Sequence, residues 1–293
     1  MPVSWQKWKL IAYLAMLVFS IIFGSTYSGP FTVPVQVFCI IFGALQFIGI
    51  FGLMHESAHG HLAANRKVNR LLGEAMSLIV GTSYPGYRAA HLTHHARFRT
   101  EADPQEIIFP KRSAPATMAL LTVASVVGAP IFLLVRAPMI ALKHTGVLRA
   151  LWGPIAAVAL YALLSQVLPN EQWYFLLWTI LAGSVLGSLN DMVYHQGLVA
   201  EDTLQACTSF DCDAFGQMFL SGANRHAEHH AYPDVPGPRL VKVAKVLRED
   251  FQSRGIPYER SFTVAYLRRF FTNPLFLPLA SPQEQDKPAR ADA

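Results

Sequence analysis

Uncharged apolar segments dominate the first two thirds of the chain. No charged residue occurs from Leu10 to Met54, and the turn-forming sequence Ser28-Gly29-Pro30 divides this run in two. A membrane-spanning helix needs about 20 apolar residues, so the run is long enough for two helices joined by a hairpin. It is too long for a cleaved signal peptide. We therefore predict membrane spans at residues 10–28 and 32–54.

Three more uncharged segments follow, at Ser113–Val135, Ala150–Asn170 and Gln172–Asn190, and each is long enough to cross a bilayer. Basic residues favour the cytoplasmic side of a membrane. They precede the first span and follow the second, so the N-terminus and residues 55–112 are predicted to be cytoplasmic. The basic residues after the second span are Arg66, Lys67, Arg70, Arg88, Arg97, Arg99, Lys111 and Arg112.

The chain has clusters of histidine before and after these three segments. The number of segments that cross the membrane therefore decides whether all the clusters lie on one side of it. They share the cytoplasmic side if only two of the three segments cross, and the basic residues Arg136, Lys143 and Arg149 agree with this choice. We predict spans at residues 150–169 and 172–190. The segment Ser113–Leu142 is predicted to be embedded or interfacial, broken at Pro130 and Pro138, without crossing.

Two further segments complete the predicted fold. Leu71–Tyr87 is interrupted by charged and helix-breaking residues, so it is expected at the interface or against protein. Near the C-terminus, an amphipathic helix is predicted that either packs on a cytosolic cap or lies on the membrane surface. Its apolar positions are Leu240, Val243, Ala244, Leu247 and Phe251, and its basic positions are Lys242, Lys245 and Arg248.

The predicted fold class is an all-α integral membrane protein with about four transmembrane helices, an interfacial segment and a cytosolic helical cap. Residues 1–280 are expected to form a single domain, and residues 281–293 a disordered tail. The composition agrees, with 52% hydrophobic and 15% charged residues and a mean hydropathy of +0.30. The net charge of +5 is modest and the basic residues flank apolar runs, so no nucleic acid partner is expected. The three cysteines form no even disulfide set and no C-x-x-C pair, so neither a secreted disulfide scaffold nor a cysteine-built zinc site is indicated.

Histidine is the unusual residue of this chain, with 11 copies. All except His144 fall into four short clusters, and helical spacing of i, i+3 and i+4 places residues on one face. His61 would point away from His59 if their helix continued. Nine imidazoles are therefore predicted to converge: His55, His59, His91, His94, His95, His195, His226, His229 and His230.

Nine imidazoles are too many for one metal ion but suit two ions with four or five nitrogens each. Imidazole binds zinc, copper, iron and nickel, and the ligand number and membrane position favour two irons. Nearby carboxylates can accept the other ring N–H of each ligand and fix its orientation. The candidates for this role are Glu56, Asp103 and Glu228, with Asp191 and Asp202 also close in sequence.

At these residues the chain resembles the membrane fatty acid desaturase family, the histidine-box enzymes that also include lipid hydroxylases and carotenoid ketolases. Three boxes carry the resemblance, at His55–His59, His91–His95 and His226–His230. The flanking residues match as well, because Asp103-Pro104 follows the second box and Tyr232-Pro233-Asp234-Val235-Pro236 follows the third. The resemblance covers roughly residues 10–250.

The resemblance implies a non-haem diiron enzyme that uses dioxygen and two electrons to remove hydrogen from an unactivated acyl chain. It implies that the box histidines bind two irons together with His195, which occupies the place of an additional ligand before the third box. Some relatives also use an asparagine about one turn earlier. Here Asn190 and Asp191 stand near that place, and the sequence leaves open whether either contributes.

A fatty acid desaturase acting on an acyl-lipid or acyl-thioester is the expected activity. The lipid substrate would come from the bilayer. The chain has no iron–sulfur, haem-attachment or dinucleotide-binding motif, so an external electron donor is expected, either a ferredoxin or a cytochrome/flavin reductase system. The expected location is a bacterial inner membrane, with both termini and the histidine boxes cytoplasmic.

Other functions remain open at this stage. A carotenoid ketolase or hydroxylase, or a fatty acyl hydroxylase, would share the same iron chemistry. The sequence His55-Glu56-Ser57-Ala58-His59 also matches the H-E-x-x-H motif of zinc proteases, although an intramembrane protease would leave two histidine clusters unused. A metal transporter or a bis-histidine haem protein would place its ligands nearer the bilayer midplane than these histidines, which begin where the apolar runs end.

Overall fold

The structure is a computed structural model that describes residues 6–98, 100, 102–104, 123, 126–195 and 203–271. Two short strands, β1 (Ser209–Phe210) and β2 (Tyr258–Glu259), form a parallel pair. All other described elements are helices: α1 (Gln6–Thr26), α2 (Thr32–Ala58), α3 (Arg66–Val80), α4 (Tyr84–Arg97), η2 (Phe132–Arg136), α6 (Ala137–Thr145), α7 (Val147–Val167), α8 (Asn170–His195), η3 (Thr203–Ala206), α9 (Ala214–Leu220), α10 (His226–Ala231), α11 (Gly237–Ser253) and α12 (Phe262–Phe271).

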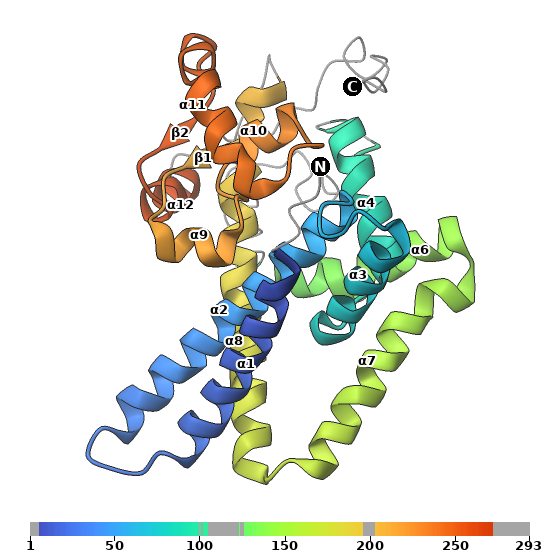
Figure 1. The fold of residues 1–293 in the computed structure, drawn as a ribbon, viewed down its shortest axis with the longest axis vertical. Helices are drawn as coiled ribbons and strands as arrows, with labels where there is room; N and C mark the ends of the chain where they lie inside the picture. Colours follow the sequence, from blue (N-terminus) through green and yellow to red (C-terminus); the bar gives the residue numbers. More distant parts are fainter. Residues whose placement is uncertain are drawn as a thin grey trace.

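Two helical hairpins, α1–α2 and α7–α8, follow the long axis of the molecule (Figure 1). They correspond to the four predicted spans, and the first two helices are joined at residues 27–31, around the predicted turn. The other end of the molecule carries α4 and the compact group formed by α9–α12, which is the predicted cap. The prediction of an all-α membrane fold is confirmed, whereas the single domain of residues 1–280 stays a prediction and the tail at 281–293 lies outside the described residues.

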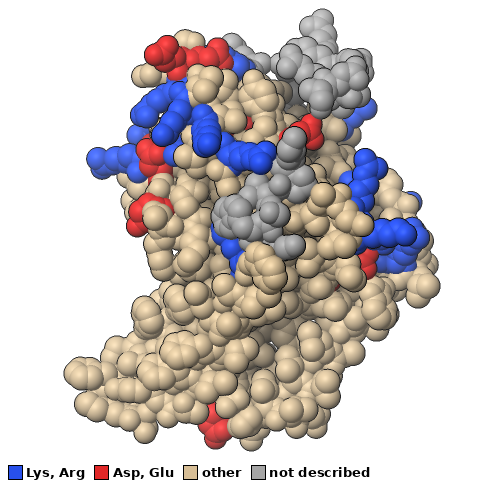
Figure 2. Space-filling model, in the orientation of Figure 1, with Lys and Arg blue, Asp and Glu red and all other residues tan. Residues whose placement is uncertain are grey.

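The outer surface of the two hairpins is apolar. Phe38 is 65% exposed and Val158 is 70% exposed, although both lie within long helices. Figure 2 shows that lysine, arginine, aspartate and glutamate gather at the end of the molecule that carries the cap, while the hairpins present a nearly uncharged surface. Exposed apolar side chains on helices of this length are what a lipid-facing surface requires.

A fifth described helix, Val126–Thr145, is also long and apolar enough to span a membrane. Its described part includes much of the segment predicted as non-crossing, but the predicted breaks at Pro130 and Pro138 are wrong, because the helix continues through both prolines. The number of crossings stays a prediction. Figure 1 shows α6 at the level of α3 and α4, running across the axis that α7 and α8 follow.

A π-helical stretch, η2, explains how the helix passes Pro138. The Ala137 N–H bonds to the carbonyl of Phe132, one residue further back than in an α-helix. The next carbonyl, that of Leu133, would need the N–H that proline lacks. The Thr82 hydroxyl donates to this carbonyl instead, at 2.5 Å. A partner distant in sequence thus replaces the missing hydrogen bond, which local sequence rules could not anticipate.

The segment predicted at the interface, Leu71–Tyr87, forms parts of two helices. Asn65 caps the start of α3 through its side chain, and Gly81, with a φ of 84°, ends it. Pro85 then lies in the first turn of α4, where proline is well tolerated. Because α3 packs against α2 and α7, this part of the chain rests on protein and holds α4 in place.

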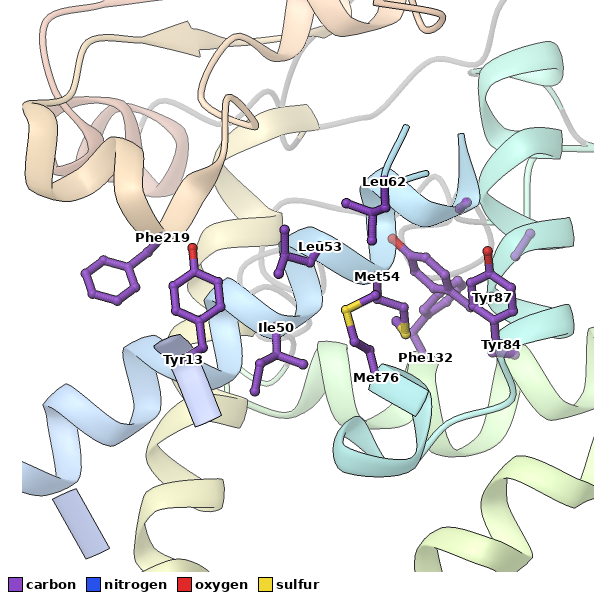
Figure 3. Packing of buried hydrophobic residues seen from close by; sticks show 13 residues of the cluster. Tyr13, Ile50, Leu53, Met54, Leu62, Met76, Tyr84, Tyr87, Phe132 and Phe219 are labelled. Atoms are coloured by element: carbon purple, nitrogen blue, oxygen red, sulfur yellow. The ribbon is translucent and has the colours of Figure 1, made fainter. Parts of the chain in front are cut away.

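The main hydrophobic core surrounds the last turns of α2 and supports the histidine-rich end of that helix. Leu53 and Met54, which precede His55, are fully buried. Figure 3 shows Met54 beside Met76 of α3, with Tyr87 of α4 nearby. The core is therefore continuous from α2 to α4, and it fixes the distance between the first two histidine boxes.

The C-terminal amphipathic helix is present as α11. Its apolar residues Leu240, Ala244 and Phe251 are buried in the cap. This is the first of the two predicted alternatives, packing on the cap rather than lying on the membrane surface. Figure 1 shows α11 at the end of the molecule opposite the α7–α8 turn, distant from the apolar hairpins. The structure therefore favours packing on the cap over binding to the membrane surface.

Gly86→Ala is expected to destabilise the protein strongly. Gly86 lies where α4 meets α6, and an added Cβ would be 1.8 Å from the Ala137 carbonyl oxygen. The backbone would have to move, which we expect to cost about 3 kcal/mol and to lower the melting temperature in detergent by on the order of 10 °C.

Gly187→Ala is the matched control for this variant. Gly187 also lies in a helix, but the nearest atom to an added Cβ, on Ala129, is 3.9 Å away. Its melting temperature should stay within about 2 °C of the parent protein, because alanine favours the helix and meets no clash. Equal melting temperatures for the two variants would show that the α4–α6 contact is looser than described.

Candidate metal centre

All nine histidines predicted to converge lie at the cap end of their helices. His55 is in the last turn of α2 and His59 caps it. The second box lies on α4, His195 is the last residue of α8, and the third box lies on α10. Four separate elements thus bring their imidazoles to the level where the apolar hairpins meet the cap (Figure 1). This level is at one end of the long apolar helices, whereas transporters bind their ions near the middle of their spans.

Five of the imidazoles form one group, in which one ring nitrogen from each residue lies within 4.8 Å of all the others. The Nε2 atom of His91 lies 2.8 Å from that of His59 and 3.1 Å from that of His95. The members of this group are His55, His59, His91, His95 and His229.

The other four imidazoles form a second group beside the first. Ring nitrogens of His94, His195 and His230 lie within 4.8 Å of one another. The Nε2 atom of His226 is 2.8 Å from that of His195, which joins the ninth imidazole to this group. The two groups adjoin, because the rings of His95 and His230 are 4.4 Å apart. The structure thus brings together five and four imidazoles, the division that two metal ions would need.

The protonation of two rings supports a cation in the second group. The Nδ1 of His94 faces both oxygens of Asp103, at 3.0 and 2.9 Å, and the Nδ1 of His195 faces the carbonyl of Ala206 at 3.1 Å. Each Nδ1 is therefore the donor, and in a neutral ring with this proton position the Nε2 atom carries a lone pair. These two Nε2 atoms lie 3.1 Å apart. Facing lone pairs repel each other unless a cation lies between them.

The distances between ring nitrogens also suit a metal. Imidazole nitrogens bind zinc at about 2.0–2.1 Å, so two ligands at right angles on one such ion are about 3 Å apart. The Nε2 atoms of His229 and His230 are buried, and in the described part of the structure neither has a hydrogen-bond partner. Buried polar atoms without partners are costly, and coordination would satisfy them. The residues present therefore fit a binuclear metal site.

Burial keeps these ligands in the form that binds metal. Removal from water lowers the pKa of His91, His95, His229 and His230 well below the usual value for histidine. The neighbouring imidazoles lower these pKa values further, because each disfavours a second positive charge. The rings are consequently neutral near pH 7, with a lone pair available for coordination.

The three carboxylates proposed to orient the ligands have different partners. Asp103 is fully buried and holds His94, as described above. Glu56 is also buried, and its Oε1 lies 3.9 Å from the Nδ1 of His55. Its Oε2 accepts hydrogen bonds from the side chain of Gln6 and the backbone N–H of Gly237. Glu56 thus links three segments that are far apart in sequence.

Glu228 is bound by a neighbouring strand. The Ser209 hydroxyl donates a hydrogen bond to its carboxylate, and burial raises the pKa of Glu228 above its usual value. Asn190 accepts a hydrogen bond from the Tyr194 hydroxyl, and neither nitrogen group includes Asp191. Asp202 lies outside the described residues.

His61 lies closer to the site than its predicted orientation implies. The prediction assumed a continuing helix, but α2 ends at Ala58 and Gly60 adopts a φ of 82°. The His61 N–H then bonds back to the Glu56 carbonyl at 2.9 Å, which is the usual hydrogen bond of a glycine-terminated helix. The His61 ring lies 5.5 Å from that of His59, and its Nδ1 is 3.6 Å from Glu56. Gly60 was the signal for this turn.

Aromatic residues that the sequence reasoning missed line the site. The Phe98 ring contacts those of His94, His195 and His230 at centroid distances of 4.6–5.0 Å. The Tyr194 ring stacks on His226 at 4.2 Å. These rings exclude water from the second group and keep its imidazoles in place. Phe98 follows His94 by one helical turn, which is the local signal that could have identified it.

The arrangement disfavours the zinc protease alternative. In that alternative Glu56 would be the general base and would need to face a metal-bound water. Instead its carboxylate is engaged by Gln6 and Gly237. The two histidines of the motif also share their group with three more imidazoles, which leaves no role for His91, His95 and His229 in a mononuclear zinc site. His144 is exposed at the end of α6 and belongs to neither group.

Comparison with known proteins agrees with the site. An acyl-lipid (8-3)-desaturase of Rebecca salina is 26% identical over 248 residues, which are 71% of this chain and 56% of that protein. The chain thus spans little more than half the length of this relative. The model of the fatty acid desaturase family matches residues 31–262, which include all nine converging histidines. Because this match covers well over half of the chain, the protein belongs to the fatty acid desaturase family.

Proposed function

We propose that the protein is an O₂-dependent diiron desaturase that introduces a double bond into the acyl chain of a membrane lipid. Family membership makes it an oxidoreductase, and the named relative favours an acyl-lipid substrate. The observation that supports two metal ions is the division of the nine imidazoles into adjoining groups of five and four. Iron is proposed because removal of hydrogen from an unactivated chain needs a strong oxidant that side chains do not supply.

Iron bound at this site would supply the activation of dioxygen that cleavage of an unactivated C–H bond requires. The chain's own residues have three tasks. The imidazoles hold the metals, Asp103 and the Ala206 carbonyl keep the Nδ1 protons of His94 and His195 in place, and Phe98 excludes water. The histidines lie at the cap end of the apolar hairpins, so an acyl chain could reach them from the bilayer while electrons arrive from the aqueous side.

Mass analysis of lipids tests the proposed reaction. The full-length protein is expressed in a bacterial host with a ferredoxin or cytochrome reducing system, and the host lipids and pigments are compared with those of a strain expressing His94→Ala. Desaturation lowers the mass of an acyl chain by two hydrogens. A gain of one oxygen in an acyl chain would show a hydroxylase instead, and oxygenated pigments would show a ketolase or hydroxylase acting on carotenoids. Unchanged lipids and pigments, with the metal present, would contradict the proposal.

The proposed orientation places the histidines and the cap in the cytoplasm of a bacterial cell. A reporter fused after Thr145, between α6 and α7, is expected to be active on the cytoplasmic side, because Arg136, Lys143 and Arg149 flank this point. A fusion at Gly29, in the turn between α1 and α2, is the control and should be exported. An exported signal at Thr145 would mean that the helix Val126–Thr145 crosses the membrane, and the four-span topology would be wrong.

A further inference from the structure

The N-terminal half of α11 presents a basic surface that helix stability does not explain. Arg239, Lys242 and Lys245 are exposed, and no acidic residue occurs between Gly237 and Arg248. Basic side chains near a helix N-terminus face the positive end of the helix dipole, which is unfavourable. Figure 2 shows basic side chains gathered over this part of the cap. A charge arrangement that costs stability is a reason to look for a binding partner.

An exposed apolar side chain lies among these charges. Val246 is 82% exposed, and it follows Lys242 by four residues and Arg239 by seven, so the three share a face of the helix. Tyr232, between the third histidine box and α11, is 47% exposed. Exposed apolar and aromatic side chains bordered by charged ones are typical of protein–protein interfaces. We define the α11 surface as Tyr232, Arg239, Lys242, Lys245 and Val246.

The α11 surface lies close to the candidate metal centre. The backbone N–H of Gly237, the first residue of α11, donates to Glu56 at 3.0 Å, and Glu56 lies 3.9 Å from His55. A helix rises about 1.5 Å per residue, so Arg239 and Lys242 lie within about 8 Å of this contact along the axis. Glu56 therefore connects the first residue of α11 to His55, a candidate ligand of the five-imidazole group.

We propose that the α11 surface is the docking site for an acidic, soluble electron-transfer protein. This proposal rests on the proposed function, which needs an external reductant. In each turnover two donor molecules are oxidised by one electron each. These two electrons, two protons and the two hydrogens of the acyl chain reduce one O₂ to two waters. Complementary charge would steer the donor to the cap, and its contact with Val246 and Tyr232 would place it next to the metal site.

The membrane surface is the other polyanion that a basic helix could meet, but the position of α11 favours a soluble partner. Figure 1 places α11 at the end of the molecule distant from the apolar hairpins. Its own apolar face is already buried in the cap through Leu240, Ala244 and Phe251. A helix lying on a bilayer would instead direct that face into the lipid.

The test uses the full-length protein in nanodiscs and an acidic [2Fe–2S] ferredoxin as the probe. The double variant Lys242→Glu/Lys245→Glu is compared with Arg66→Glu/Lys67→Glu, which makes the same charge change at exposed positions of α3. Dissociation constants are measured at about 50 mM and 300 mM salt. We expect the α11 variant to bind at least about 10-fold more weakly at low salt, and the α3 variant to bind within about twofold of the parent.

Further measurements separate docking from catalysis. The protein is reduced with dithionite without oxygen, the excess dithionite is removed, and a single turnover is started with O₂. Its product yield should be equal in the parent and the α11 variant, whereas steady-state turnover driven by ferredoxin should fall about 10-fold in the variant. Absence of product in this single turnover of the parent would contradict the proposed function, and the binding measurement would still decide the docking site. Salt-insensitive binding, equal loss in both variants, or a variant effect that depends on anionic lipid in the nanodisc would each overturn the docking proposal.

Discussion

His94→Ala and His229→Ala are each expected to abolish metal loading and turnover while leaving the protein inserted in the membrane. The two residues come from different imidazole groups, and both rings are buried. Removing either ring leaves a cavity and one ligand fewer in its group. Because loss of a group that only supports a ligand already costs about 10–100-fold in metal affinity or activity, loss of a ligand should cost more.

The measurements are iron per chain by elemental analysis and lipid mass after expression. His144→Ala is the matched control, since His144 is exposed and lies in neither group. It should retain the metal content and turnover of the parent protein. Normal turnover by His94→Ala or His229→Ala would remove the corresponding group from the proposed metal centre.

Asp103→Asn is expected to lower metal affinity or activity by about 10–100-fold without removing a ligand. The carboxylate of Asp103 accepts the Nδ1 proton of His94, so the Nε2 lone pair points toward His195. An asparagine of the same size can present its NH₂ to Nδ1, which would favour the opposite proton position on the ring. The Nε2 atom would then carry a proton and could not bind metal.

Metal affinity is measured by competition with a chelator, and activity by the lipid assay. Asp250→Asn is the control, because Asp250 forms a surface ion pair with Arg254 and such pairs contribute little. Its metal affinity and activity should match those of the parent. If Asp103→Asn retained full metal affinity as well, the carboxylate would have no part in fixing the ring of His94.

Local patterns in the sequence predicted the long apolar helices and the face that the histidines of one box share, because both depend on residues close together in the chain. The hydropathy of α1 and α2 and the three-and-four spacing on α4 and α10 are of this kind. The spacing predicted which imidazoles share a face. The structure added how the faces are divided, with His94 and His95 of one box serving different groups.

Features that depend on distant partners could not be predicted. The helix continues through Pro138 because Thr82 supplies a hydrogen bond from another segment. Glu56 is held by Gln6 and by Gly237, and no local pattern links these positions. The orientation of His61 is a different case, since Gly60 could have predicted the end of α2. The error there came from extending a helix past a glycine.

The sequence pattern of α11 predicted the helix but not the role of its basic face. The alternation of apolar and basic residues predicted an amphipathic helix, and α11 is one. Whether its basic face meets water, lipid or protein depends on where the helix lies relative to the hairpins and the metal centre. Only the fold places α11 at the end of the molecule away from the apolar hairpins (Figure 1), with its first residue in contact with Glu56.

The central claim is that nine imidazoles hold two metal ions in adjoining sites. Elemental analysis of the purified full-length protein, combined with X-ray absorption at the iron edge, tests it most directly. We predict two irons per chain, each with a shell of four or five nitrogen ligands and without sulfur, as the groups of five and four imidazoles require. A single zinc ion per chain, or one iron in a haem, would contradict the account.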